Sequence, residues 1–186
     1  VDLKTIFDIG NRSSRITHGH PTGYLAAGFL AATIASLLEG RELFETLDCV
    51  TRLLKEYDQH NEVLKIVQTA VSLSTQNVSA PEAFNVLGQG WVAEEALAIA
   101  VYACLSRERL EDAVIFAVNH GGDSDSTGSI TGHIKGVIEG YDAIPARWVE
   151  KLELHNTIMK VAENLYWAKT GEQEDKLNEI YGSIDQ

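Results

Sequence analysis

The segment Gly23–Leu38 reads GYLAAGFLAATIASLL and contains no charged residue. Its leucine, alanine and phenylalanine side chains fall on every face of a helix with 3.6 residues per turn, which is typical of a helix buried on all sides. Gly40 follows shortly after and is suited to end such a helix, because glycine readily adopts the left-handed conformation found after a last helical turn. We therefore predict a buried helix over Tyr24–Leu38.

Apolar residues recur at helical spacing through most of the chain, and no alternating run typical of a strand is found. Ser79, Pro81 and Glu82 form the pattern of a helix start with a capping box. The sequence therefore predicts an all-α fold of orthogonally packed helices, in which residues 1–186 belong to a single domain and residues 171–186 form a loosely held tail. The other expected helices cover Glu42–Tyr57, His60–Leu73, Val92–Leu105, Leu110–Val118, Asp125–Gly140 and Arg147–Lys169.

The 186 residues carry 27 acidic and 15 basic side chains, which gives a formal net charge of -12. An acidic excess of this size repels a phosphate backbone, so nucleic-acid binding is not expected. No apolar segment reaches about 20 residues without a charge, and the first residues lack the pattern of a signal peptide, so no membrane contact is predicted. Cys49 and Cys104 lie in apolar helical segments and are expected to be reduced thiols, which favours a cytoplasmic protein.

The segment Asn119–Gly128, NHGGDSDSTG, holds two carboxylates two residues apart. Asp123 and Asp125 cannot share one face of a helix, but they can converge in a loop or in an opening helical turn. Together with Ser126 and neighbouring hydroxyl groups they supply hard oxygen donors, which suit Mg²⁺, Mn²⁺ or Ca²⁺ rather than zinc. The alternative is a polar loop that caps a helix, with Asp125 or Ser126 as the N-cap.

Two more specific interpretations of this segment fit less well. An EF-hand loop that starts at Asp123 would have its glycine at Gly128, but it lacks the Asp or Asn expected at Thr127 and the Glu expected at Ile134. A phosphatase with an aspartyl nucleophile places an Asp-x-Asp motif after a buried strand, whereas the surrounding pattern here is helical.

Glycines recur every four residues at Gly128, Gly132, Gly136 and Gly140. This spacing places them on one helix face, at some cost in helix propensity. We expect the stripe to permit the close approach of another helix, which would hold the preceding aspartate loop rigidly.

The segment Ile16–Tyr24, ITHGHPTGY, directly precedes the buried helix. A glycine-containing turn that leads into a helix N-terminus can offer backbone amides and the imidazole of His18 to a phosphate or ribose. An ordinary turn with a capping histidine is the alternative. His18 and His20 are a poor zinc site, because no cysteine or second histidine pair accompanies them. His120 adjoins the aspartate loop and could line the same cleft.

Three segments resemble the ADP-ribosylglycohydrolase family and occur in the family's order: ITHGHPTGYLAAGFLAA (16–32), GQGWVAEEALAIAVYA (88–103) and NHGGDSDSTGSITGHIKG (119–136). The last is highly specific, the first is supportive, and the middle one mostly describes a helix. The resemblance implies an all-α fold with two divalent cations, Mg²⁺ or Mn²⁺, at the base of an ADP-ribose cleft. It implies catalytic, metal-binding roles for Asp123 and Asp125, a metal-binding role for Ser126, and substrate-binding roles for His18, Gly121 and Gly122.

Members of that family also carry, in their first half, a Gly-Asp-Ala segment with a nearby glutamate and a Thr-Asp-Asp triplet, and neither occurs in this chain. The resemblance therefore implies the C-terminal portion of the family's domain, completed by an N-terminal segment or a partner fragment. The expected function is metal-dependent hydrolysis of the glycosidic bond between ADP-ribose and a protein side chain or a related ADP-ribosyl compound. The alternative, for a chain natively this short, is a non-catalytic ADP-ribose-binding protein or a crystallin-like structural relative.

Overall fold

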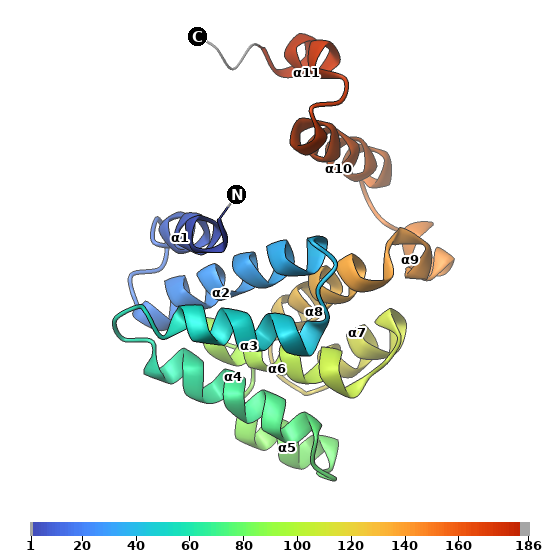
Figure 1. Ribbon diagram of the computed structural model, residues 1–186. Coiled ribbons are helices and arrows are strands. Elements are labelled where there is room, and N and C mark those ends of the chain that lie inside the picture. The colour runs from blue at the N-terminus through green and yellow to red at the C-terminus, as the bar shows by residue number, and fades with distance from the viewer. Residues whose placement is uncertain (1, 183–186) are drawn as a thin grey trace. The chain divides into compact units, whose positions relative to one another are not determined.

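The computed structural model describes residues 2–182, with the side chain of Glu174 excepted, and every regular element in that range is helical (Figure 1). This confirms the all-α fold. The elements are α1 (Leu3–Ser14), α2 (Pro21–Leu38), α3 (Leu43–Leu54), α4 (Asn61–Ser74), α5 (Ala80–Leu87), α6 (Ala93–Ser106), α7 (Leu110–Val118), α8 (Ser124–Glu139), the 3-10 turn η1 (Tyr141–Ala143), α9 (Ala146–Val149), α10 (His155–Thr170) and α11 (Glu174–Tyr181).

The chain divides between Ile144 and Pro145 into two compact units. The first contains α1 to α8 and η1, and the second contains α9 to α11. Within the second unit, the side-chain amide of Asn164 in α10 donates to the hydroxyl of Tyr181 in α11 at 2.8 Å. The tail expected over residues 171–186 therefore includes a helix, and residues 183–186 lie outside the described range. That residues 1–186 belong to a single domain stays a prediction.

Helices α2 and α6 form the centre of the first unit. Every residue from Ala96 to Cys104 in α6 is buried, and so is most of α2. By length and composition alone α2 could cross a membrane, but 61% of it lies inside the fold, which is the position of a core helix. The buried helix predicted over Tyr24–Leu38 is thus confirmed, and it begins earlier, at Pro21, with His20 as its N-cap.

Helix α1 has no counterpart among the predicted helices, and it packs closely on α2. A β-carbon on Gly28 of α2 would lie 2.6 Å from the ring of Phe7, and one on Gly10 of α1 would lie 2.8 Å from Ala31. Glycine at these two positions removes the atom that would hold the helices apart. Phe7 is fully buried in this contact and stacks on the ring of Tyr57.

The helix predicted over Arg147–Lys169 is wrong as one element, because this segment forms α9 and α10 with a break between them. Leu154, at the end of the break, has a φ of 59°. A left-handed leucine is uncommon, and the apolar spacing of a sequence gives no signal for it. The capping box at Ser79 and Glu82, in contrast, is confirmed at the start of α5.

The glycine stripe of α8 does not serve as a packing face in the described residues, and that prediction is wrong beyond its first position. A β-carbon on Gly132, Gly136 or Gly140 would meet no atom within 4 Å, whereas one on Gly128 would lie 2.7 Å from Val118. Only Gly128 therefore lets α8 approach α7 closely.

A buried lysine fastens α8 to the connection between α6 and α7. Lys135 is 5% exposed, pairs with Glu139 at 2.6 Å and donates to the backbone carbonyl of Glu108. Glu139 also accepts from the backbone amide of Leu110 at 2.9 Å. Because Leu110 begins α7, the carboxylate satisfies one of the amides that the first helical turn leaves without a partner.

The two cysteines are both free thiols, as expected. Cys104 is buried in α6, and this burial raises the pKa of its thiol to about 12. Cys49 is partly buried on α3. No disulfide therefore joins helices in this chain.

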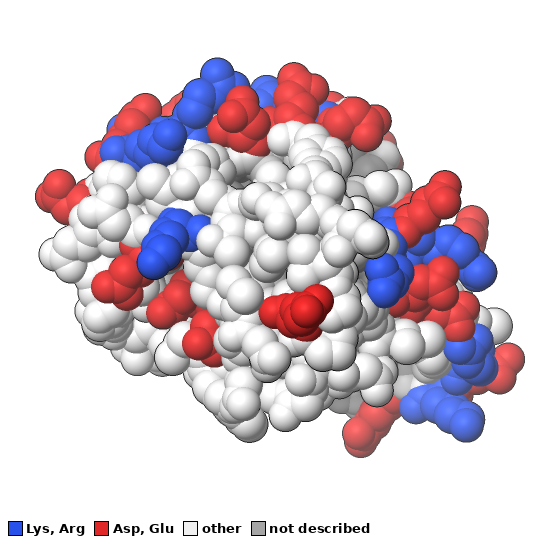
Figure 2. All heavy atoms as spheres, turned by 90° about the horizontal axis from the view of Figure 1, so that it is seen from below, with Lys and Arg blue, Asp and Glu red and all other residues white. Residues whose placement is uncertain are grey.

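Charged side chains of opposite sign lie next to one another on the surface. Lys4 pairs with Glu56 at 2.6 Å, and Arg52 pairs with Asp48 at 3.0 Å. Figure 2 shows acidic and basic residues next to one another around the edge of one face, whose middle is largely uncharged. Such a face offers a phosphate backbone no continuous basic track, although the absence of nucleic-acid binding stays a prediction.

Candidate active site

A cavity of about 320 Å³ lies in the first unit, where the start of α2, the loop before α6 and the start of α8 meet. Alanine and leucine side chains from α2 and α6 supply its apolar part. The polar and aromatic groups that line it come from three separate segments of the chain: Ser14 and His18, then Trp91, then Asp123 and Ser126. Two of these segments, those of His18 and Asp123, contain residues predicted to form a site. The segment of Trp91 contains none.

Asp123 is the N-cap residue of α8, and Asp125 lies in the first turn. Hydrogen bonding to Asp125 and then to Ser126 lowers the pKa of Asp123, partial burial opposes this shift, and the nearby His120 adds a smaller lowering. Asp123 and Ser126 line the cavity, whereas Asp125 is exposed beside it. The two carboxyl groups therefore converge in an opening helical turn, as predicted, and neither Asp125 nor Ser126 is the N-cap.

Two hydroxyl groups fasten the start of α8 to the end of α7. Ser124 donates from Oγ to the carbonyl of Val118 at 2.8 Å, and Thr127 donates from Oγ1 to the carbonyl of Ala117 at 3.1 Å. Thr127 is fully buried. The Ser-x-x-Thr part of the motif is therefore structural, since it orients the turn that carries the two aspartates.

His18 lines the same cavity from another part of the chain, the turn before α2. The His18 side chain is exposed, and its Nδ1 lies 2.8 Å from the hydroxyl of Thr17. A β-carbon on Gly23 would lie 3.0 Å from the β-carbon of His18. His20 is the capping histidine instead: its Nδ1 accepts from the backbone amide of Thr22 at 3.4 Å. The two histidines of this turn therefore have separate positions and separate roles.

Gly121 and Gly122 do not line the cavity. Gly121 is exposed with a φ of 88°, and a β-carbon on Gly122 would lie 2.0 Å from the carbonyl oxygen of Gln89. The close approach at Gly122 is thus to the loop before α6. Contact of these glycines with a substrate stays a prediction.

The donor set at the start of α8 fits a hard divalent cation in part. Two carboxylates and a hydroxyl are the oxygen ligands that Mg²⁺ and Mn²⁺ prefer. When both aspartates are ionised, their proximity places two negative charges side by side, which a cation would relieve. Within residues 2–182, however, no three or more His, Cys, Asp or Glu side chains gather as a metal cluster.

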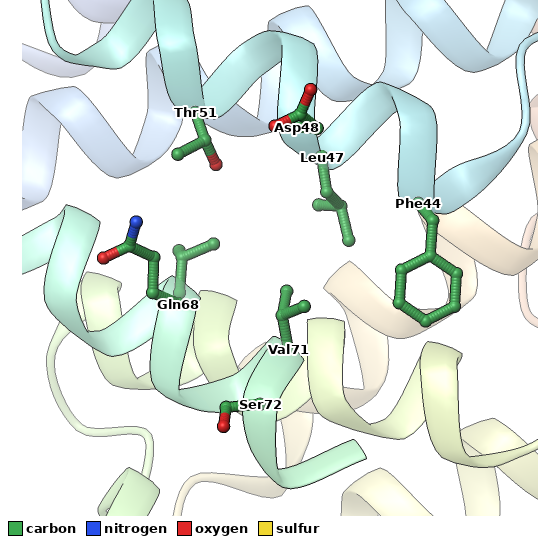
Figure 3. Close-up of a pocket in the computed structure, with 8 residues that line it drawn as sticks. Phe44, Leu47, Asp48, Thr51, Gln68, Val71 and Ser72 are labelled. Carbon is green, nitrogen blue, oxygen red and sulfur yellow. The ribbon is translucent and has the colours of Figure 1, made fainter. Parts of the chain in front are cut away.

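Another cavity, of about 380 Å³, lies between α3 and α4 (Figure 3). Its interior is formed by Leu47, Val67 and Val71, and its acidic residue, Asp48, pairs with Arg52. This groove lacks the converging carboxylates of the first cavity, so it is the weaker candidate for chemistry.

Comparison with known proteins identifies the family. The sequence model of the ADP-ribosylglycohydrolase family matches residues 2–175. The chain belongs to the ADP-ribosylglycohydrolase family. An uncharacterized protein of Archaeoglobus fulgidus is 32% identical over 154 residues, which is 83% of this chain and 48% of that protein.

Other relatives carry names that state an activity. The ADP-ribosylarginine hydrolase Tri1 of Serratia proteamaculans is 26% identical over 89% of this chain and 42% of its own length. The ADP-ribosyl-[dinitrogen reductase] glycohydrolase of Rhodospirillum rubrum is 28% identical over 76% of this chain and 41% of its own length. The chain thus spans about half the length of the curated relatives it matches.

Three residues near the cavity were not predicted as site residues, although the sequence analysis mentions one of them, His120, as a neighbour of the aspartate loop. Trp91 lines the cavity and is 68% exposed, and its Nε1 donates to the side-chain carbonyl of Gln89 at 3.0 Å. Glu95 and His120 lie behind the cavity and contact the same loop. The Gly-x-Gly-Trp sequence before α6 is a signal for a loop of this kind. The segment that the loop contacts, around Asp123, lies more than 30 residues away in the chain, so the sequence does not indicate the contact.

Proposed function

We propose that this chain contributes the ADP-ribose-binding cleft and part of the metal site of a glycohydrolase that cleaves ADP-ribose from a modified protein. The observation that carries the proposal is a cavity lined by Asp123, Ser126 and His18, with Asp125 exposed next to it in the same helical turn as Ser126. Membership of the ADP-ribosylglycohydrolase family supports the same reaction class.

Asp123, Asp125 and Ser126 would hold Mg²⁺ or Mn²⁺ through their side-chain oxygens. The bound cations would supply Lewis acidity and would offset the negative charge of the diphosphate, which the chain's own net charge of -12 opposes. A pair of cations requires more ligands than these three residues provide. We therefore propose that an acidic segment outside the described residues, on the same polypeptide or on a partner fragment, completes the site.

The residues of this chain would bind and orient the substrate. Cleavage of a glycosidic bond passes through an oxocarbenium-like carbon, so positive charge develops on the ribose. The carboxylate of Asp123 at the cavity wall would stabilise that charge. Because its pKa is lowered, the Asp123 carboxyl stays ionised at pH values where an ordinary aspartate begins to be protonated. His18 would donate a hydrogen bond to the diphosphate or the ribose.

Trp91 would bind the adenine. Its indole is exposed at the cavity, and the hydrogen bond to Gln89 fixes one edge of the ring, which leaves a flat face available. Stacking of a base on an aromatic side chain contributes about 1–3 kcal/mol in nucleic-acid complexes. The same contact would recognise a nucleotide without reading its hydrogen-bonding edge.

The substrate that we propose to test first is a protein with ADP-ribosylated arginine, because relatives from two bacteria are named ADP-ribosylarginine hydrolases. The protein is isolated at the length it has in its own cells and is incubated with the modified protein and Mg²⁺, Mn²⁺ or EDTA. Chromatography measures the released ADP-ribose. We expect release that depends on the metal and is lost in Asp123→Asn and Asp125→Asn.

The control variant is Asp58→Asn, which removes an exposed carboxylate from the connection between α3 and α4. It should leave the release of ADP-ribose unchanged. Release that continues in EDTA, or in both aspartate variants, would refute the proposed site. Binding of ADP-ribose without its release would instead support the non-catalytic alternative.

A further inference from the structure

The loop Gly88–Gly90 contacts the backbone of Asp123, and the carboxylate of Glu95 holds this loop in place. Oε2 of Glu95, in the first turn of α6, accepts from the backbone amides of Gln89 at 3.0 Å and of Gly90 at 3.1 Å. Gly88 has a φ of 97°, and a β-carbon on it would lie 2.3 Å from the carboxyl carbon of Glu95. The glycine thus leaves the space that the carboxylate occupies.

This arrangement directs the carbonyl of Gln89 toward the aspartate loop. That carbonyl accepts from the backbone amide of Asp123 at 2.8 Å and lies 3.0 Å from Nε2 of His120. Gly122 permits the contact, because any side chain there would collide with the same oxygen. The position of Asp123 is therefore set by a loop more than 30 residues earlier in the chain.

His120 braces the same junction from the end of α7. Its Nδ1 lies 2.7 Å from the carbonyl of Ala117, and its Nε2 faces the carbonyl of Gln89. Both ring nitrogens therefore lie against backbone carbonyl groups, one in α7 and one in the loop before α6. The ring is also packed against Phe84 of α5, with centroids 5.6 Å apart.

We propose that Glu95 is a positioning residue for the candidate metal site, and that it acts on Asp123 through the Gln89 carbonyl. This inference rests on the proposed function for its metal and extends it to a residue outside the cavity. Glu95 does not line the cavity and its Oε2 accepts from two backbone amides of the loop, so we place it in the support of the site and not among the metal ligands. Partners that orient a ligand residue typically change metal affinity by about 10- to 100-fold when they are removed.

The test compares Glu95→Ala and the more conservative Glu95→Gln with wild type, and uses Glu62→Gln as the control. Glu62 is an exposed acid in the first turn of α4 and does not line the cavity, so its variant removes the same charge from a comparable helical position away from the loop. Two quantities are measured on the folded full chain: hydrogen exchange of the Asp123 amide without metal, and the Kd for Mn²⁺ by electron paramagnetic resonance.

In Glu95→Ala we expect exchange at the Asp123 amide to accelerate by up to roughly tenfold, since its hydrogen-bond acceptor is no longer held in place. The Kd for Mn²⁺ should rise by about 10- to 100-fold. Glu95→Gln should fall between wild type and alanine, because its amide oxygen can still accept. Glu62→Gln should match wild type in both measurements.

Unchanged exchange at Asp123 in a folded Glu95→Ala or Glu95→Gln protein would overturn the inference. Equal effects of the Glu62 and Glu95 variants would do the same, because they would indicate a general loss of charge. If wild type binds no Mn²⁺, the proposed function fails, but the exchange measurement still decides whether Glu95 positions Asp123.

Discussion

Replacement of Gly122 by alanine should destabilise the first unit and displace Asp123. The added β-carbon would lie 2.0 Å from the carbonyl oxygen of Gln89 and 2.7 Å from its carbonyl carbon. These atoms belong to the backbone, so they cannot rotate away as a side chain would. Relief of the contact requires a shift of more than about 1 Å, since non-bonded carbon atoms pack near 3.5–4.0 Å.

A shift of that size breaks the hydrogen bond from the Asp123 amide to Gln89, which is 2.8 Å long. Overpacking costs about 1–3 kcal/mol, and a lost hydrogen bond costs about 1 kcal/mol more. We expect the free energy of unfolding to fall by about 2–4 kcal/mol, which is a Tm decrease of at least roughly 4 °C for a chain of this size.

The measurement is urea denaturation with the slope m compared between proteins, so that a change in the midpoint can be assigned to stability. Gly132→Ala is the control, because a β-carbon there meets no atom within 4 Å. This helical position should gain about 0.5–1 kcal/mol from the better helix former. If Gly122→Ala is as stable as wild type, the close approach of the two loops is wrong.

Three further substitutions or reactions test the packing. Gly28→Ala should cost about 1–3 kcal/mol in urea denaturation, because its β-carbon would lie 2.6 Å from the ring of Phe7, and equal stability would contradict the close helix crossing. Lys135→Met should lower the free energy of unfolding by about 2 kcal/mol, which is less than for a fully buried ion pair because the partner carboxylate of Glu139 is 23% exposed. The double variant Lys135→Met/Glu139→Gln should recover part of this loss, because it no longer leaves an unpaired charge. Ellman's reagent at pH 8 should modify Cys49 in the native protein and Cys104 only after unfolding, because burial raises the pKa of Cys104 to about 12; rapid reaction of two thiols in the native state would argue against that burial.

The helices were predictable wherever local chemistry decides them. The apolar block of α2 allows no exposed face, so its burial follows from composition alone. The start of α5 follows from the capping box of Ser79 and Glu82, which needs only residues three apart. The break before α10 was not predictable, because it depends on a left-handed leucine, Leu154, that no residue type signals.

The candidate site divides in the same way. The convergence of Asp123 and Asp125 depends on two residues of separation and on a helix start, so the sequence predicts it. The contact of Gln89 with the Asp123 amide is made by two backbone groups from distant segments, and such a contact leaves no trace in residue spacing. The role of Glu95 was missed for that reason, although the residue lies in a segment that resembles the family.

The contact between the two loops uses only the backbone of residue 89, and the side chain of Gln89 is exposed. The position can therefore exchange its side chain while the aspartate loop keeps its anchor. Gln89→Cys in a Cys49→Ser background would provide a single accessible thiol two residues before Trp91, although it also removes the hydrogen bond from Trp91 to the Gln89 side chain. A fluorescent dye attached there would test the proposed nucleotide binding in solution, without a coupled assay.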